Sequence, residues 1–343
     1  QASRSSFNNH LGVPLTLAAL PAAPVPAIQE IGMNAPGEIT ALSSLARPDI
    51  AIITRIADSH AGFFDSLEAI AAAKAEIFDG LRAGGTAILN RDDAFFEMLA
   101  EHARNAGAGR IVTFGTDAEA DFRLCDTSRG EDHMTVTASL NGASLSFTLG
   151  MRGSHWAMNV MAVLAALDAL GLDARKAAGY LHDFNELPGR GAVSKGRFAD
   201  VGITLIDDSY NAGPASMAAA FSSLAAAPPQ VMVLSDMLEL GDGTAAAHAA
   251  LAPAITTLRP RLLVTSGREM SRMAAALPCA TRHRAADSAA HATQLLRNHI
   301  RDGDTVFIKG SNGSGAWRVA ADLTSAMSTT SSVSTVGETT DAA

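Results

Sequence analysis

Cysteine is scarce in this sequence: Cys125 and Cys279 are the only two among 343 residues, and no CxxC pair occurs. Two thiols that lie far apart in the chain are typical of a protein from a reducing compartment. We therefore expect both side chains to be inert thiols of the core.

A surplus of positive charge is also missing. The 26 lysines and arginines are outnumbered by 35 aspartates and glutamates, so the formal net charge is −9 at pH 7. A nucleic-acid-binding protein would present a basic face, and no nucleic-acid partner is expected. A nucleotide ligand remains compatible with this charge, because metal ions and local backbone amides can hold its phosphates.

No segment has the pattern of a membrane span or of a secretory signal. The most apolar stretch, LGVPLTLAALPAAPVPAI (11–28), contains four prolines, which would break a membrane helix because each removes a backbone donor. A secretory peptide would need an initiating methionine and a more basic start. We expect this stretch to belong to a folded domain, with no membrane insertion, and we expect that Gln1 is not the natural start.

Compact motifs for metal ions and phosphates are absent as well. The ten histidines are scattered, without HExxH or a Cys/His pairing. The P-loop pattern GxxxxGK[ST] does not occur, and the glycine-rich segments 189–197 and 309–317 lack its spacing. The glycines of 310–315 are, by themselves, more typical of a tight turn than of a phosphate cradle.

The sequence does contain a regular alternation of short β-branched runs and alanine-rich amphipathic stretches. Runs typical of strands are 49–54, 86–90, 110–114, 203–207, 230–235, 261–265 and 304–310, and helical patterns include 66–82, 93–105 and 214–226. This alternation indicates an α/β protein with βαβ units and mostly parallel sheets. The length suffices for about two domains.

Residues 121–187 interrupt the alternation. Segment 121–150 reads as antiparallel strands around Asn141-Gly142, a strong hairpin signal. Helical patterns follow over 154–170 and 174–184, and a new βαβ series begins after the irregular segment ELPGRGAV. We therefore predict domains over 1–186 and 187–328, followed by a disordered Ser/Thr-rich tail over 329–343.

The segment LIDDSYNAGPASM (205–217) ends a hydrophobic strand in a polar cluster. A turn with a helix cap explains it, since Asp and Asn bond their own backbone in turns. A ligand site explains it equally well, because ligands of open α/β sheets bind beyond the carboxyl ends of the strands. Two other polar residues are as ambiguous: Lys74 is typical of a solvated helix lysine, and His60 of a polar loop histidine.

A set of longer motifs, taken together, resembles the Mur ligase family. In order along the chain they are FNNHLGVPLTL (7–17), EIGMNAPGEI (30–39), RPDIAIIT (47–54), His60, SLEAIAAAKAEIF (66–78), GSHWAMNVMAVLAAL (153–167), LPGRG (187–191), TLIDDSYNAGPASM (204–217), SDMLELG (235–241) and VFIKGSNGS (306–314). The resemblance covers about residues 5–325. The strings IDDSYNA and DMLELG are similar to the branch of the family that adds D-alanyl-D-alanine.

The resemblance implies a fold and an activity. The fold is a P-loop-type central ATP-binding domain, with a parallel sheet plus a small antiparallel sheet, followed by a Rossmann-like C-terminal domain. The activity is an ATP- and Mg²⁺-dependent amide ligation, in which D-Ala-D-Ala joins UDP-N-acetylmuramoyl-tripeptide through an acyl phosphate during peptidoglycan synthesis. A monomer working in the cytoplasm is implied.

The resemblance also assigns roles to residues. Glu30 and His60 would be magnesium ligands or lie beside them, and Lys74 matches a lysine that becomes carbamylated and can then hold a second metal. Such a lysine must first lose its proton, which a desolvated site favours. Contacts to ATP would come from Asn159, His155, Arg190, Asp208, Tyr210 and Asn211, with Tyr210 and Asn211 lining an interdomain cleft. Contacts to the sugar-peptide and dipeptide substrates would come from Asn8, Asn9, Lys309 and Ser311.

The chain departs from the family pattern at several points. The P-loop and an N-terminal UDP-binding domain are expected before residue 7, so we expect an incomplete fragment with poor activity. Smaller departures are Gly213 in place of Asn, Ser235 in place of Gly, and Gly315-Ala316 in place of Arg-Met. Two alternatives remain open: a sibling Mur or folate-type ligase with another acceptor, and a non-catalytic nucleotide-binding module.

Overall fold

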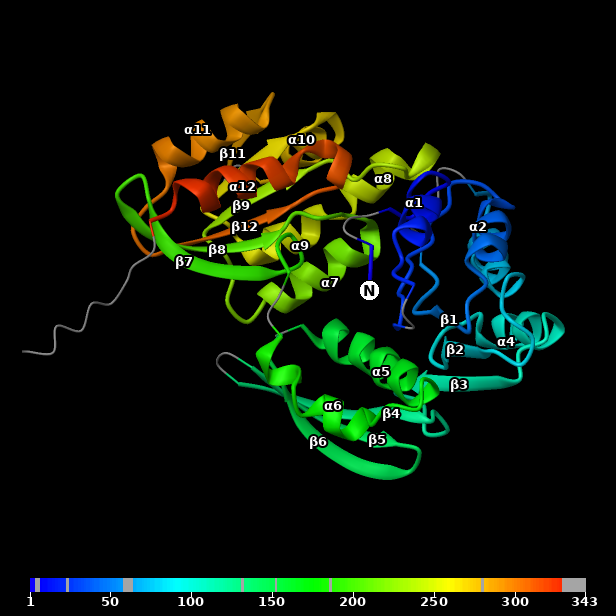
Figure 1. Cartoon of the computed structure of the whole chain (residues 1–343). Coiled ribbons are helices and arrows are strands. Elements are labelled where there is room, and N and C mark those ends of the chain that lie inside the picture. The colour runs from blue at the N-terminus through cyan, green and yellow to red at the C-terminus, as the bar shows by residue number, and fades with distance from the viewer. Residues whose placement is uncertain are drawn as a thin grey trace, which may run out of the picture. The chain divides into compact units, whose positions relative to one another are not determined.

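The computed structural model describes residues 1–3, 7–22, 25–57, 64–130, 133–151, 153–184, 187–278 and 281–328. The chain forms two compact units (Figure 1). The first comprises Gln1–Glu186 with Glu239–Gly243, and the second comprises Leu187–Leu238 with the chain from Thr244 onward. His60, Cys279 and the predicted tail 329–343 lie outside the described residues.

The described strands of the first unit form one mixed sheet in the order β1-β2-β3-β4-β5-β6. The bounds are β1 Ile50–Ile53, β2 Thr86–Asn90, β3 Arg110–Gly115, β4 Phe122–Arg129, β5 Met134–Leu140 and β6 Ala143–Leu149. The pairs β1–β2, β2–β3 and β3–β4 are parallel, whereas the pairs β4–β5 and β5–β6 are antiparallel. The expected antiparallel strands therefore extend the parallel sheet instead of forming a separate one.

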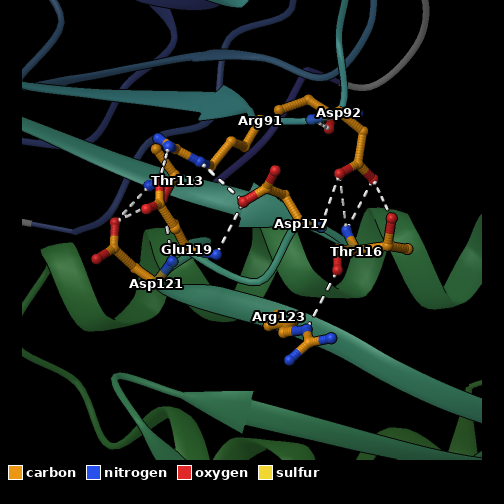
Figure 2. A network of polar contacts seen from close by, with 9 residues as sticks. Arg91, Asp92, Thr113, Thr116, Asp117, Glu119, Asp121 and Arg123 are labelled. Carbon is orange, nitrogen blue, oxygen red and sulfur yellow. Dashed lines mark hydrogen bonds and ion pairs between the residues drawn. The ribbon is translucent and has the colours of Figure 1, made fainter.

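The join between β3 and β4 is short. These strands pair only at Phe114↔Phe122 and Gly115↔Arg123. The side chain of Asp121 continues the join, because its Oδ2 accepts hydrogen bonds of 2.8 Å from both N and Oγ1 of Thr113, and its own N–H donates to Thr113 Oγ1 at 3.0 Å (Figure 2). A carboxylate thus replaces part of the strand ladder.

Further polar contacts surround this join in Figure 2. Asp92 Oδ2 accepts a 2.7 Å bond from the Thr116 amide, and Arg91 pairs with Asp117 at 3.0 Å and with Glu119. The Glu119 backbone N–H, followed by Arg91, holds the pKa of the Asp117 carboxyl below its usual value. The loops after β2 and β3 are therefore held together by charge-assisted hydrogen bonds.

The predicted hairpin is confirmed between β5 and β6. Asn141 and Gly142 have φ of 49° and 82°, the pair of positive values that a two-residue type I′ turn needs. The expectation for Cys125 is wrong: its side chain is exposed. Phe122 and Leu124 pack in the core, so alternation places Cys125 on the opposite face, at the bulge where the register of β4 against β5 shifts between Leu124 and Asp126.

Helices cover both faces of this sheet. Their bounds are α1 Gly12–Ala18, α2 Glu38–Ala46, α3 Leu67–Ala75, α4 Phe96–Asn105, α5 Ser154–Ala169 and α6 Ala174–Ala178, with 3-10 turns η1 Glu76–Phe78 and η2 Leu181–Asp183. Strand β2 shows the two faces: Ile88 packs in the cluster that contains α5, whereas Ala87 and Leu89 pack in the cluster that contains α3 and α4. Helix α1 lies in the stretch 11–28, which was expected to fold.

The described strands of the second unit form a sheet in the order β11-β10-β9-β12-β8-β7. The bounds are β7 Ala192–Phe198, β8 Val201–Asp208, β9 Val231–Ser235, β10 Leu262–Ser266, β11 Arg282–Ala286 and β12 Asp304–Lys309. All neighbours are parallel except β7, which is antiparallel to β8. This α/β sheet agrees with the expected fold class.

The helices of the second unit are α7 Pro214–Leu224, α8 Thr244–Ala249, α9 Ala252–Leu258, α10 Arg268–Ala275, α11 Ala289–His299 and α12 Ala316–Ala326, with the 3-10 turn η4 Asn312–Ser314. The 3-10 turn η3 Gly241–Gly243 lies in the segment that belongs to the first unit. Strand β12 again serves two faces. Ile308 packs in the cluster with α11 and α12, whereas the Phe307 ring meets Phe221 of α7 edge-on at 6.5 Å. Within the described ranges, no helix has the length and apolar content that a bilayer crossing requires.

Candidate functional site

Three of the predicted site residues of the first unit come together. Asn8 Nδ2 donates a 2.8 Å hydrogen bond to Glu30 Oε1. The negative charge of the Glu30 carboxylate acts to raise the pKa of Lys74. The backbone supports this arrangement, because the Gly32 N–H donates to Asn8 O at 2.8 Å. Residues 22 positions apart are thus fixed side by side.

Lys74 lies near the carboxyl end of α3, a helix that begins where Ser66 Oγ accepts a hydrogen bond from the Ala69 N–H. The side chain is half-buried between alanines. Burial lowers the pKa of the Lys74 ammonium, and the carboxylate of Glu30 only partly opposes this effect. A lysine amine that loses its proton more readily is a nucleophile at lower pH than an exposed lysine.

Gln29 was missed by the sequence reasoning. Its Nε2 donates to the carbonyls of Phe7 at 3.0 Å and Glu30 at 2.7 Å. These hydrogen bonds join the two chain segments that carry Asn8 and Glu30. Its Oε1 is buried and has no hydrogen-bond partner among the described residues. Adjacency to Glu30 was the only sequence signal for this role.

Two further candidates of this unit, His155 and Asn159, lie on α5. Both side chains are exposed, and a spacing of four residues places them on one helix face. The His155 ring lies 5.3 Å from the Trp156 ring, centroid to centroid, at an angle of 39°. The helix therefore offers an imidazole and an amide next to each other.

In the second unit, Arg190 and Tyr210 form a stacked pair. The Arg190 guanidinium carbon lies 3.9 Å from the centroid of the Tyr210 ring, a cation–π geometry. The Tyr210 N–H donates to Gly189 O at 2.8 Å. Gly189 has φ of +78°, and a Cβ there would lie 3.1 Å from the Tyr210 Cβ, so only glycine fits this turn without strain.

Asp207 holds this turn and was also missed. Its Oδ2 accepts from the Gly189 N–H at 2.9 Å, and its backbone carbonyl accepts from the Gly191 N–H at 2.8 Å. Its Oδ1 accepts from Ser209 Oγ at 2.5 Å. The first aspartate of the pair therefore has the turn-forming role, which leaves the second as the ligand candidate.

Asp208, Lys309 and Ser311 meet where β8 and β12 end. Lys309 Nζ donates to Asp208 Oδ2 at 2.7 Å and to Asn211 O at 3.1 Å. Ser311 Oγ donates to Ala212 O at 3.0 Å and accepts from the Leu238 N–H at 2.9 Å. Lys309 and Ser311 are buried, so in this structure both contact the loop after β8.

The comparison with known proteins identifies the family. The domain profile described as "Mur ligase middle domain" matches residues 1–167, and "Mur ligase, glutamate ligase domain" matches residues 195–312. A UDP-N-acetylmuramoyl-tripeptide–D-alanyl-D-alanine ligase of Bacillus subtilis is 34% identical over 93% of this chain and 68% of its own length. The chain belongs to the Mur ligase family.

Solved structures of Mur ligases share the fold. MurF of Acinetobacter baumannii superposes with a TM-score of 0.80 and 27% identity, over 94% of this chain and 70% of the other. The MurF ligase of Thermotoga maritima, in complex with ADP, has a TM-score of 0.79, 21% identity and coverages of 94% and 72%. The chain spans 68% of the length of the Bacillus subtilis ligase and 53% of that of an Escherichia coli ligase with the same activity in its name.

Mg²⁺, the metal expected for this Mur ligase, prefers oxygen ligands. Among the described residues, no group of three or more His, Cys, Asp and Glu side chains could hold a metal ion. Glu30 supplies a carboxylate, but a protonated Lys74 beside it would repel a cation. The residues would fit Mg²⁺ with the carbamate that the family resemblance implies for Lys74, because Lys74 and Glu30 would then both supply oxygen ligands.

Asn9 and Asn211, which are both expected to contact a bound ligand, accept hydrogen bonds from backbone N–H groups in this structure. Asn9 Oδ1 accepts from the N–H groups of Leu11 at 3.1 Å and Gly12 at 2.9 Å, where α1 begins. Asn211 Oδ1 accepts from the Ala212 N–H at 2.9 Å. Both remain exposed, and their contact with ligands stays a prediction.

The departure at Ser235 from the usual Mur ligase motif has a structural counterpart. Ser235 Oγ lies 2.6 Å from Ser314 Oγ, and it occupies the space beside Gly310, where an added Cβ would lie only 1.7 Å from it. Gly310 is therefore needed because Ser235 fills its neighbourhood.

Proposed function

We propose that the protein is an ATP-dependent ligase that joins D-Ala-D-Ala to the peptide of UDP-N-acetylmuramoyl-tripeptide. The observation that carries the proposal is the group of Asn8, Glu30 and Lys74, in which a half-buried amine with a lowered pKa lies beside a carboxylate. The names of the related ligases supply the substrates. We also propose that it works in the cytoplasm as a monomer.

The reaction has two steps. The terminal carboxylate of the tripeptide attacks the γ-phosphorus of ATP, which forms an acyl phosphate and breaks the bond to the leaving ADP. The amine of D-Ala-D-Ala then attacks the acyl carbon, loses a proton and expels phosphate, which leaves an amide. The first step brings a carboxylate against an anionic phosphate, and the second develops negative charge on the acyl oxygen and the leaving phosphate, so both need positive charge close to the phosphates.

Lys74 would serve this chemistry as a carbamate. Its neutral amine adds to carbon dioxide and loses a proton, which converts a cation into an anion. Glu30, the carbamate and His60 would then hold Mg²⁺, which supplies charge neutralisation at the transferring phosphate when it is bound. Asn8 would orient the Glu30 carboxylate through the 2.8 Å hydrogen bond.

Polar side chains would bind the nucleoside of ATP. We assign the ribose to Asp208, with Arg190 and Tyr210 beside it, and the adenine to Asn159 and His155. The ADP complex of the Thermotoga maritima ligase supports a nucleotide as the ligand of this fold. Asn9 and Asn211 would add contacts to the sugar peptide and the nucleotide.

A coupled assay tests the proposal. We would measure phosphate release by the protein with ATP, Mg²⁺, UDP-N-acetylmuramoyl-tripeptide and D-Ala-D-Ala, and expect release only when both substrates are present. Release with another amino acid in place of D-Ala-D-Ala would indicate a sibling ligase instead. Binding of ADP without any turnover would indicate a non-catalytic nucleotide-binding module, which the motif departures leave as the second candidate.

A further inference from the structure

Two side chains at the end of β12 contact the loop that follows β8. Lys309 Nζ reaches Asp208 Oδ2 at 2.7 Å and Asn211 O at 3.1 Å, and Ser311 Oγ reaches Ala212 O at 3.0 Å. Three of the five consecutive residues 208–212 are thus bonded from one strand end. The bonded residues are separated by 98 to 101 positions in the sequence.

The side chain of Lys309 is buried against the loop after β8, so its ammonium interacts with groups of that loop. Its side chain is 4% exposed, whereas that of Asp208 is 24% exposed. A buried ammonium is stable only when it is paired and hydrogen-bonded, and the partners of Lys309 are the carboxylate and the carbonyl of this loop. A side chain enclosed in this way is poorly placed to receive a peptide substrate.

We propose that Lys309 is a positioning residue of the nucleotide site and acts through Asp208. Its ammonium fixes the Asp208 carboxylate and, through Asn211, the backbone of the loop. It also neutralises a carboxylate that would otherwise repel the phosphates of a nucleoside di- or triphosphate. This inference rests on the proposed function, because it assumes that Asp208 contacts the ribose.

The test is the affinity of the chain for ADP, measured by titration calorimetry with Lys309→Met and with Lys195→Met as the matched control. Lys195 is an exposed lysine of β7 in the same unit. Loss of a charge-assisted hydrogen bond predicts a rise in Kd of about tenfold or more for Lys309→Met. The control is expected to bind like the wild type.

A double-mutant cycle separates positioning from a general loss of structure. If Lys309 acts through Asp208, the double variant Lys309→Met with Asp208→Asn binds ADP no more weakly than Asp208→Asn alone. Independent effects, in which the two rises in Kd multiply, would overturn the inference. Circular dichroism checks that each variant is folded.

Other outcomes are equally decisive. If the wild type binds ADP and Lys309→Met binds it as tightly, the inference is wrong while the proposed function stands. If the wild type does not bind ADP, the proposed function is wrong and the inference falls with it. Should Lys309→Met not fold, Ser311→Ala, which removes the bond to Ala212, is expected to raise Kd several-fold, and an unchanged Kd would overturn the inference.

Discussion

At the residue scale, neighbouring residues of the same type have different roles in this protein. Asp207 bonds the backbone of the turn that carries Arg190, whereas Asp208 pairs with Lys309. Lys74 and Lys309 are both withdrawn from solvent, but Lys309 has a carboxylate at 2.7 Å, and burial outweighs the effect of Glu30 on Lys74. Local environment, not residue type, decides which group can react.

Lys74 makes stability depend on pH. In the folded state its pKa is lowered from 10.5, so the unfolded chain binds the proton more tightly. The resulting penalty on folding is fully present below the lowered pKa, and it disappears as pH rises through the interval up to 10.5. In buffer free of carbon dioxide, Lys74→Met is therefore expected to raise the thermal unfolding temperature at pH 7, and to raise it less near pH 10.

The control for this prediction is Lys176→Met, an exposed lysine of α6 in the same unit. It is expected to leave the unfolding temperature almost unchanged at both pH values. A gain for Lys74→Met that is the same at both pH values would contradict the prediction.

At the element scale, the polar groups at strand ends determine how the sheets continue. In the first sheet, Asp121 bonds Thr113 where the parallel ladder between β3 and β4 is short (Figure 2). The pairing becomes antiparallel one strand further on, between β4 and β5. In the second sheet, the edge strand β11 contains Arg282, His283 and Arg284. Charged side chains at a free edge discourage pairing with another chain.

We expect Asp121→Ala to destabilise the first unit by about 2–3 kcal/mol, because it leaves the N–H and hydroxyl of the buried Thr113 without their acceptor. Urea unfolding followed by Trp156 fluorescence would measure this. Asp126→Ala, at an exposed position of β4, is the control and is expected to change stability by less than about 0.5 kcal/mol. Equal effects would show that the join does not depend on Asp121.

A substitution at Gly213, the N-cap of helix α7, is expected to raise the stability of the second unit. Gly213 has an extended backbone (φ −148°) and open space around an added Cβ. Gly213→Asn, the residue usual in the family motif, is expected to stabilise the second unit by about 0.5–1 kcal/mol through capping and lower chain entropy. Thermal unfolding would show the gain, and Gly213→Ala, which lacks the capping oxygen, should be less stable than the Asn variant.

At the scale of the whole molecule, each unit has its own core. Two clusters flank the sheet of the first unit, and one is built on β8, β9, β10 and β12 of the second. Each unit also carries one of the two tryptophans, Trp156 on α5 and Trp317 on α12. Fluorescence can therefore follow each unit separately.

Phe122→Ala tests this organisation. Phe122 is fully buried in the first unit, and its truncation is expected to cost about 3–5 kcal/mol there. In single-tryptophan variants, the transition reported by Trp156 should move to a lower temperature by much more than the one reported by Trp317. Equal shifts of the two transitions would show that the units unfold as one.

The sequence predicted most elements, because their signals are local. The strands of 49–54, 86–90 and 110–114 are short apolar runs rich in β-branched residues, and Asn141-Gly142 has turn chemistry that few other dipeptides share. Strands β7 and β11 were missed, because AVSKGRF and RHRAA have little apolar alternation and lie at the sheet edge.

The sequence by itself determined the α/β class, through the alternation of strand and helix patterns, and its longer motifs determined the Mur ligase resemblance and the candidate site residues. Each of these signals depends on residues close together in the chain. Tertiary structure alone decided that Asn8 meets Glu30, that Cys125 is exposed at a bulge, and that Lys309 is buried against Asp208. These contacts depend on strand register and on pairing between residues up to 101 positions apart, which no local pattern encodes.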